Sequence, residues 1–352
     1  MARLWVAGLL IAAACGKGDK PSDKPAGKPA DPATPADKPA EPAVKPTTPE
    51  APAAKIKQAT NTADLALLPI DSDQVLGVNL ALIQTSPMWK EFIAPRVMSD
   101  DVKARLDEIK QKCNFDPMAV VKSASIGLKD GAAGKEGVVV VHGPDKAAVT
   151  ACAEKMKTDK DAKVDITQDG DVTILKPKSA GPDTPSIAFM FTSDDTAVIV
   201  VGPKATGAGV KAVVAATGGL STSNAFVDMY NRLETEKSLW MLMNGKAKAF
   251  QPLAMAGVKP SHVFGSLDVS DGLNLDLRMR LASQDQATQA ATMMKSQLAP
   301  AAGMLNIDKI DVGADGQDLK LGMIVSKANV PKMLKSLQGL MSMGGGAGMG
   351  NP

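Results

Sequence analysis

The sequence predicts an α+β fold: two related units of antiparallel sheet with helices packed on one face, after a disordered N-terminal tether. Three observations predict it. Short segments of alternating apolar residues flank Asp-Gly turns, as in antiparallel hairpins. Segments of helical periodicity separate these hairpins. Finally, the order strand, helix, strand, strand, helix, strand, strand, helix occurs twice, with an extra hairpin in the first half.

The N-terminus carries an export signal. After the positive Arg3, an apolar run of 11 residues extends from Leu4 to Ala14. A membrane-spanning helix needs about 20 apolar residues, whereas a run of this length suits a signal peptide. The end of this run and the two residues after it, Ile11 to Gly16, resemble a lipobox, although Ala12 stands where Leu is commoner. We therefore predict that residues 1–14 are a lipoprotein signal peptide and that Cys15 is acylated. The alternative is an ordinary secretory signal with an incidental cysteine.

The acylated cysteine is predicted to begin a disordered tether that covers residues 15–56. Between Lys17 and Lys55 there are ten prolines, seven lysines and six acidic residues, with almost no large apolar side chains. Proline fixes an extended backbone, so such a segment behaves as a semi-rigid spacer. An alternative is a docking arm, like the Lys-Pro and Glu-Pro repeats of energy-transducing envelope proteins.

The first α+β unit is predicted at residues 57–220. Ser86 is expected to cap a helix that has Pro87 at its first position and an apolar face that includes Trp89. The other expected elements are strand Val75–Ile83, helix Asp100–Lys112, strands Ser123–Lys129 and Gly137–His142, helix Pro144–Met156, a hairpin of Val164–Ile166 and Val172–Leu175, strands Ile187–Phe191 and Ala197–Val201, and helix Val210–Ala216.

The second unit is predicted at residues 221–340, followed by a disordered Gly- and Met-rich tail at 341–352. Ser283 is expected to cap a helix that ends near Leu298. The other expected elements are strand Ser238–Met243, helix Lys248–Met255, hairpin strands His262–Val269 and Leu273–Leu281, hairpin strands Ile307–Val312 and Leu319–Val325, and helix Ala328–Leu340.

Two cysteines, Cys113 and Cys152, remain once Cys15 is acylated. An exported protein enters an oxidising compartment, where an even number of cysteines favours a disulfide. We expect a bridge between the two helices of the first unit that carry them. The alternative is a pair of buried free thiols; no C-x-x-C motif indicates a redox-active pair.

No motif for catalysis or metal binding is found. The chain has two histidines, His142 and His262, each at the end of an expected strand and without a neighbouring residue at metal-ligand spacing. Most of the methionines fall at core positions, where they fill gaps as Leu would. We therefore predict no catalytic residue, no metal and no cofactor.

Charge and aromatic content bear on the partners. The net charge is +2 and aromatic residues make up 3% of the chain. A near-neutral chain with few stacking side chains is a poor nucleic-acid binder, so no such partner is expected. Trp89 and Trp240 stand at related points of the two units and are the candidate ligand-binding residues. Their alternative role is core packing.

Three short stretches resemble known sequences. Leu67 to Leu80, Ser86 to Trp89, and Cys113 to Pro117 are similar to uncharacterised envelope lipoproteins of myxobacteria-like species. The pattern also resembles, loosely, the uncharacterised domain family DUF3352. The resemblance implies a repeated α+β fold and no known activity, and no functional residue is carried over from it.

Together these features predict a membrane-anchored bacterial lipoprotein that acts as a non-enzymatic envelope binding or structural module. Its expected partners are the lipid bilayer, through Cys15, and an envelope protein or an apolar ligand. Gly16 follows the cysteine, which by enterobacterial sorting rules favours the outer membrane, facing the periplasm. Two alternatives remain open: a carrier of an apolar ligand in a concave half-barrel, and a hydrolase whose site forms only in the fold.

Overall fold

The computed structural model describes residues 62–129, 136–160, 162, 164–178, 185–245, 250 and 258–344. The predicted signal peptide, Cys15, the tether and residues 345–352 of the predicted tail lie outside the described residues, as does the expected helix Lys248–Met255 apart from Phe250.

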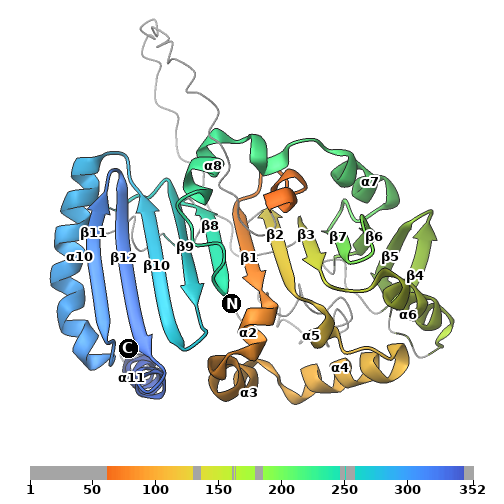
Figure 1. Cartoon of the computed structure of the whole chain (residues 1–352), viewed down its shortest axis with the longest axis horizontal. Helices are drawn as coiled ribbons and strands as arrows, with labels where there is room; N and C mark the ends of the chain where they lie inside the picture. Colours follow the sequence, from red (N-terminus) through yellow and green to blue (C-terminus); the bar gives the residue numbers. More distant parts are fainter. Residues whose placement is uncertain are drawn as a thin grey trace, which may run out of the picture.

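The described residues form one continuous antiparallel sheet of 12 strands, in the order β11-β12-β10-β9-β8-β1-β2-β3-β7-β6-β5-β4 (Figure 1). The α+β class and the antiparallel pairing are thus confirmed. The strands are β1 (Gln74–Asn79), β2 (Ser123–Lys129), β3 (Glu136–His142), β4 (Val164–Asp169), β5 (Val172–Pro177), β6 (Ile187–Phe191), β7 (Thr196–Val201), β8 (Leu239–Asn244), β9 (His262–Asp268), β10 (Gly272–Arg280), β11 (Lys309–Asp315) and β12 (Asp318–Ser326).

The same order of elements lies on either side of the central pair β1 and β8. On one side β1, β2 and β3 are neighbours, and on the other side β8, β9 and β10 are neighbours. In each half the third strand is followed by a long helix and then by a hairpin, β4–β5 or β11–β12. Strands β6 and β7 have no counterpart in the second half, and they lie between β3 and β5 in the sheet. This is the extra hairpin that the sequence predicts.

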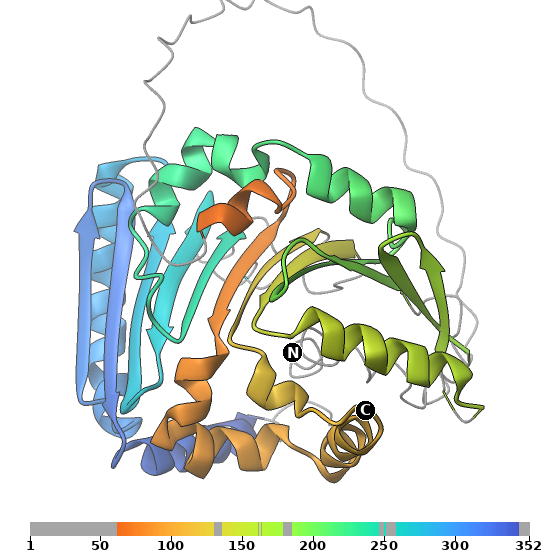
Figure 2. The ribbon, with the colours of Figure 1, turned by 45° about the vertical axis from the view of Figure 1, so that its right-hand side comes forward.

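Helices lie on both faces of the sheet, and not on one face as predicted, because strands such as β3 carry apolar residues on both sides (Figure 2). The helices and helical turns are η1 (Thr62–Ala66), α2 (Leu80–Thr85), η2 (Trp89–Ile93), α3 (Ala94–Val97), α4 (Asp100–Cys113), α5 (Pro117–Val120), α6 (Lys146–Thr158), α7 (Gly207–Ala215), η4 (Gly219–Thr222), α8 (Asn224–Tyr230), α10 (Gln284–Met304) and α11 (Val330–Gly344).

The two long crossover helices cover the same face. Val139 of β3 belongs to the cluster that packs against α6, and Leu277 of β10 packs in the cluster of α10. The strand register places Val139 and Leu277 on one face, through the intervening pairs of β2, β1, β8 and β9. The alternate residues of β3 face the other side, where Val210 of α7 and Phe226 of α8 pack. Alternation along a strand therefore gives β3 two buried faces.

The ends of several elements follow their capping residues. The predicted strand Val75–Ile83 is wrong after Asn79, because the Asn79 side chain accepts a 3.2 Å hydrogen bond from the Leu82 amide and begins α2. Ser86 caps as predicted and accepts from the Trp89 amide at 3.0 Å. The helix capped by Ser283 extends beyond the predicted end to Met304, through Pro300.

Glycine turns close three hairpins as predicted. Gly170, Gly272 and Gly316 have φ values of 61°, 122° and 60°. A side chain with a Cβ adopts this left-handed region only with strain, so glycine is the residue that suits these turns. Among the described helices, none is long and apolar enough to cross a membrane.

Candidate ligand-binding groove

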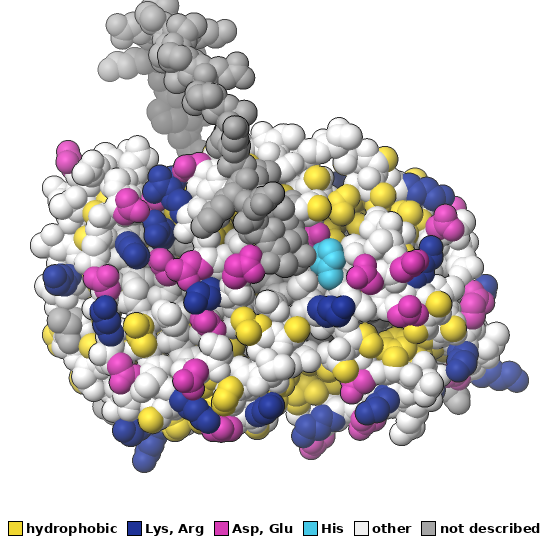
Figure 3. Space-filling view, viewed as in Figure 1, with side chains coloured by type: hydrophobic (Ala, Val, Ile, Leu, Met, Phe, Trp, Pro, Cys, Tyr) yellow, Lys and Arg dark blue, Asp and Glu magenta, His cyan; other side chains and the backbone are white. Residues whose placement is uncertain are grey.

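An apolar groove lies in the first half of the molecule, between the sheet face that α6 covers and the helices α4, α5 and α6. Its cavity volume is about 190 Å³. Its floor consists of large apolar side chains from the strands: Val141, Val164, Ile166, Leu175, Phe189 and Ile199. Figure 3 shows hydrophobic side chains gathered on this right-hand side of the molecule, above α4. The groove is therefore a continuation of the core that is open to the outside.

One wall of the groove is α4. Arg105, Glu108, Ile109 and Lys112 line it, and their spacing of three, four and seven residues places them on one side of the helix. The charged lining residues of the groove all come from this wall. Phe115, Pro117 and Val120 continue the wall through α5. The groove thus has an apolar floor and a charged edge, an arrangement that suits an amphipathic ligand.

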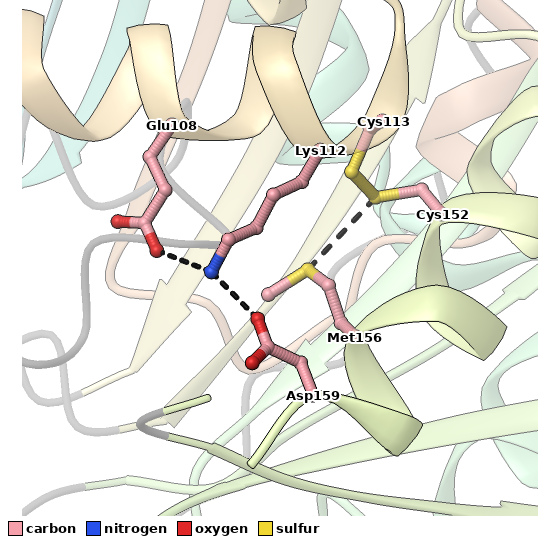
Figure 4. The surroundings of a disulfide bond; sticks show 6 residues. All are labelled: Glu108, Lys112, Cys113, Cys152, Met156 and Asp159. Atoms are coloured by element: carbon pink, nitrogen blue, oxygen red, sulfur yellow. Dashed lines mark hydrogen bonds and ion pairs between the residues drawn. A yellow bond between two sulfur atoms is a disulfide. The ribbon is translucent and has the colours of Figure 1, made fainter. Parts of the chain in front are cut away.

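A disulfide joins the α4 wall to α6, as the sequence predicts. Cys113, the last residue of α4, is bonded to Cys152 of α6, with the two Cα atoms 4.8 Å apart. The thioether of Met156 lies 3.9 Å from the Cys152 sulfur (Figure 4). Cys152 and Met156 are themselves lining residues of the groove. The bridge therefore lies at the groove and not at a distant part of the unit.

A charged contact accompanies the disulfide. The Lys112 Nζ donates to Asp159 Oδ2 at 2.6 Å and to Glu108 Oε1 at 2.8 Å, so the ammonium lies between the two carboxylates (Figure 4). Asp159 is the C-cap of α6. The hydrogen bond to Asp159, and then the one to Glu108, raises the pKa of Lys112 above its usual value. Lys112 accordingly stays charged at the edge of the groove.

A second hollow, of about 170 Å³, lies in the second half of the molecule, over β9 to β12. It is on the sheet face opposite to the one that α6 and α10 cover. Its lining contains both signs of charge: Glu234, Asp276 and Asp311 alternate with Lys237, Lys309 and Lys320. Figure 3 shows the same mixture over the left half of the molecule. Lys237 contacts Glu234 and Asp268, and Lys320 lies 4.0 Å from Asp276. The balance of charge favours neither an anion nor a cation.

His142 links η1 to the sheet through a network of hydrogen bonds. Its Nε2 lies 2.9 Å from Asp64 Oδ1, and its Nδ1 lies 3.2 Å from Thr196 Oγ1. Ser125 donates to the other oxygen of Asp64 at 2.6 Å. The hydrogen bond to Asp64 is the main cause that raises the pKa of His142. The network resembles an Asp-His-hydroxyl arrangement, yet none of its members lines the two hollows described above.

The other predicted residues lie elsewhere. Trp240 is buried in the main core, with its ring 5.2 Å from that of Tyr230 in an edge-to-face contact. Trp89 packs against a separate cluster that contains Met88 and Val269. Neither tryptophan lines the groove or the polar hollow. His262 lies on β9, and burial lowers its pKa. Among the described residues, no three His, Cys, Asp or Glu side chains are grouped so as to hold a metal ion.

No protein-family model and no curated protein matches the sequence. Among solved structures, crystal form III of TP0453 matches with a TM-score of 0.49 and 10% identity, over 77% of this chain and 97% of that chain. Crystal form I of TP0453 matches with a TM-score of 0.46 and 10% identity, over 78% of this chain and 96% of that chain. These are likenesses of fold between chains of very different sequence.

Proposed function

We propose that this chain is an exported bacterial lipoprotein, acylated at Cys15 and held at an envelope membrane, whose folded part binds an apolar ligand in the groove beside α4. The observation that carries the ligand-binding part is the apolar floor of an open groove of about 190 Å³. Among the alternatives that the sequence left open, this observation favours the carrier of an apolar ligand over a purely structural module. The residues that line the proposed site come from strands of the sheet and from α4, α5 and α6.

The energetics of the groove support this proposal. Apolar surface exposed to water raises the free energy of the folded protein, and each methylene group that a ligand buries there contributes about 0.8 kcal/mol. Drug-sized ligands occupy pockets of about 300–1,000 Å³, whereas an engineered apolar cavity of about 150 Å³ holds benzene. A groove of about 190 Å³ therefore fits a narrow ligand, such as part of one acyl chain.

The charged edge gives the ligand an orientation. The floor residues come from the strands, whereas Arg105, Glu108 and Lys112 lie together on α4. An acyl chain on the floor would place its polar head beside these side chains, where water and charges solvate it. The ligand class that we propose is a single-chain amphiphile, such as a fatty acid or a lysolipid.

The membrane anchor rests on the sequence. The lipobox-like residues before Cys15 end an apolar run of signal-peptide length, and the predicted tether of residues 15–56 begins at Cys15. Bacterial lipoproteins carry three acyl chains, more than the two signals that stable anchoring requires. The tether would let the groove reach lipids at a distance from the anchor.

A groove-filling variant tests the ligand site. Ala153 lines the groove and is buried, whereas Ala151 lies exposed on the same helix, α6. Ala153→Phe should fill the groove and abolish binding of a fluorescent polyene fatty acid, while Ala151→Phe should bind it as the unmodified protein does. Equal binding by both variants, or no binding by the unmodified protein, would contradict the site. Far-UV circular dichroism checks that both variants fold.

Intact mass spectrometry tests the anchor. The protein is extracted from membranes with detergent, and its intact mass is measured. A species that starts at Cys15 with a triacyl increment is the expected result. A soluble species that is cut elsewhere, with Cys15 unmodified, would refute the anchor but not the groove.

A further inference from the structure

Few buried apolar contacts hold the α4 wall to the rest of the molecule. Of the fourteen residues in Asp100–Cys113, only Leu106 and Cys113 are buried. None of the residues of α4 belongs to the four buried apolar clusters of the described structure. Most helical stability in proteins comes from packing of an apolar face, so packing holds α4 only weakly.

Two links tie the last residues of α4 to α6. One is the Cys113–Cys152 disulfide, and the other is the contact between Lys112 and Asp159. In contrast, α5 has its own attachment, because Gln84 of α2 donates to the Met118 carbonyl at 2.7 Å. Lys110 of α4 also lies 3.6 Å from Asp116, the N-cap of α5. Loss of the two links would therefore free the end of α4 from α6 and leave it joined to α5, which stays in place.

The links also lie where the groove is lined from both sides. Lys112 of α4 and Cys152 and Met156 of α6 are all lining residues. A ligand that enters between the helices must pass beside these residues, and a separation of α4 from α6 would widen that path. The disulfide thus acts on the groove itself.

We propose that the Cys113–Cys152 disulfide sets how fast an apolar ligand enters and leaves the groove, by fixing the α4 wall against α6. This inference rests on the proposed ligand site. A dithiol reductant would transfer two electrons and two protons to the disulfide, giving the thiols of Cys113 and Cys152 and the reductant's own disulfide. Reduction removes the covalent one of the two links, so that only the contact of Lys112 with Asp159 holds the end of α4 against α6. The wall then moves more freely and the groove opens more often, while the floor on β3 to β7 keeps its structure.

Stopped-flow fluorescence tests the inference. The mature chain with Cys15→Ser, which stays unacylated, is mixed with a polyene fatty acid before and after reduction. We expect association and dissociation to become about fivefold faster or more on reduction, as for a gated site. The variant Cys113→Ser/Cys152→Ser should match the reduced protein and should not respond to reductant.

A matched pair of variants separates the wall from general destabilisation. Lys112→Met removes the contact with Asp159 and keeps the disulfide, so exchange of the fatty acid should become about twofold faster. Lys103→Met is the control, because Lys103 is exposed and contacts Asp100 on the same helix at 3.7 Å. Its exchange rates should equal those of the unmodified protein.

Hydrogen exchange provides a second measurement that does not depend on a variant. On reduction, the amides of α4 should exchange faster, whereas those of β3 and β7 should be unchanged. Equal fatty-acid rates in the oxidised and reduced protein, with unchanged α4 exchange, would overturn the inference while the ligand site stands. Absence of fatty-acid binding in every form would overturn the proposed site and this inference together.

Discussion

Trp240 occupies the space beside Gly77 that a side chain there would fill. The two residues are directly paired across β1 and β8, and a Cβ built on Gly77 would overlap the indole ring. Trp240 in turn meets Tyr230 edge to face, with the ring centroids 5.2 Å apart. The central strand pair therefore depends on a residue without a side chain, which lets the indole lie flat across β1.

Gly77→Ala should destabilise the fold. The added methyl group must displace the buried indole, and overpacking of this kind costs about 1 to 3 kcal/mol in unfolding free energy. Urea denaturation followed by tryptophan fluorescence measures the change. Gly313→Ala on β11 is the control, because nothing lies within 4 Å of a Cβ there. If the two variants lose equal stability, the Trp240 contact is not the cause.

Asp318→Asn should cost about 2 to 3 kcal/mol of stability, because the guanidinium of Arg280 loses its buried carboxylate partner and keeps the half-exposed Asp228, at 2.8 Å. The Asp318 side chain is 1% exposed and accepts from Arg280 at 2.8 and 3.1 Å, with Arg232 at 3.3 Å. The matched control is Asp315→Asn, since Asp315 is 56% exposed and contacts Arg278 and Arg232. Exposed pairs contribute about 1 kcal/mol or less. Urea denaturation measures the unfolding free energy of each variant. Equal losses in the two variants would show that the burial of Asp318 does not strengthen its contribution to stability.

The two histidines should affect stability with opposite dependence on pH. Asp64 raises the pKa of His142 above its ordinary value of 6.5. The stability that this histidine contributes is therefore fully present below pH 6.5 and is lost as pH rises through its folded-state pKa. Burial lowers the pKa of His262, so it opposes folding as pH falls below 6.5. His142→Gln should therefore lose more stability at pH 5 than at pH 9, and His262→Gln should gain at pH 5.

Urea titrations of both variants and the unmodified chain across this pH range measure these differences. An identical pH profile for His142→Gln and the unmodified chain would show that the contact with Asp64 does not persist in solution.

Removal of the disulfide should lower the unfolding free energy by about 3 to 4 kcal/mol, according to the chain-entropy model for a loop of this length. The loop between Cys113 and Cys152 spans 39 residues. Thermal melts of Cys113→Ser/Cys152→Ser and of the unmodified chain, with and without reductant, measure the loss. The variant's melting temperature should be insensitive to reductant, and a reductant-sensitive variant would mean that the effect arises elsewhere.

The sequence pattern predicts most of the sheet, for physical reasons that are local. Alternation and the glycine turns at Gly170, Gly272 and Gly316 specify the hairpins, because each signal lies within a few residues. The end of β1 at Asn79 was missed because the apolar pattern continues into α2 without a break. The short helix α8, Asn224–Tyr230, was not predicted, although Ser223 caps it and accepts from the Phe226 amide at 3.3 Å.

The groove could not be predicted in this way. Val164, Ile166 and Leu175 alternate as core residues do, and in the structure they belong to a buried cluster. Whether such side chains face a partner or an open space depends on α4, whose lining residues are far away in the sequence. The cysteine count predicted the disulfide but not its position at a groove. Trp240 lies in the main core, and Trp89 packs half-buried against a separate cluster, where their size fills space between elements.

The position of β1 also has a consequence for the order of folding. Strands β1 to β7 complete one side of the sheet by Val201, whereas β8, the other neighbour of β1, begins at Leu239. During synthesis the first half can thus assemble with β1 as a free edge, which is a hazard for pairing with other chains. The second half then adds β8, β9 and β10 to that edge in turn, and β12 and β11 follow as a hairpin. The strand made first is the last of its side to be protected, and it is the template on which the rest of the sheet grows.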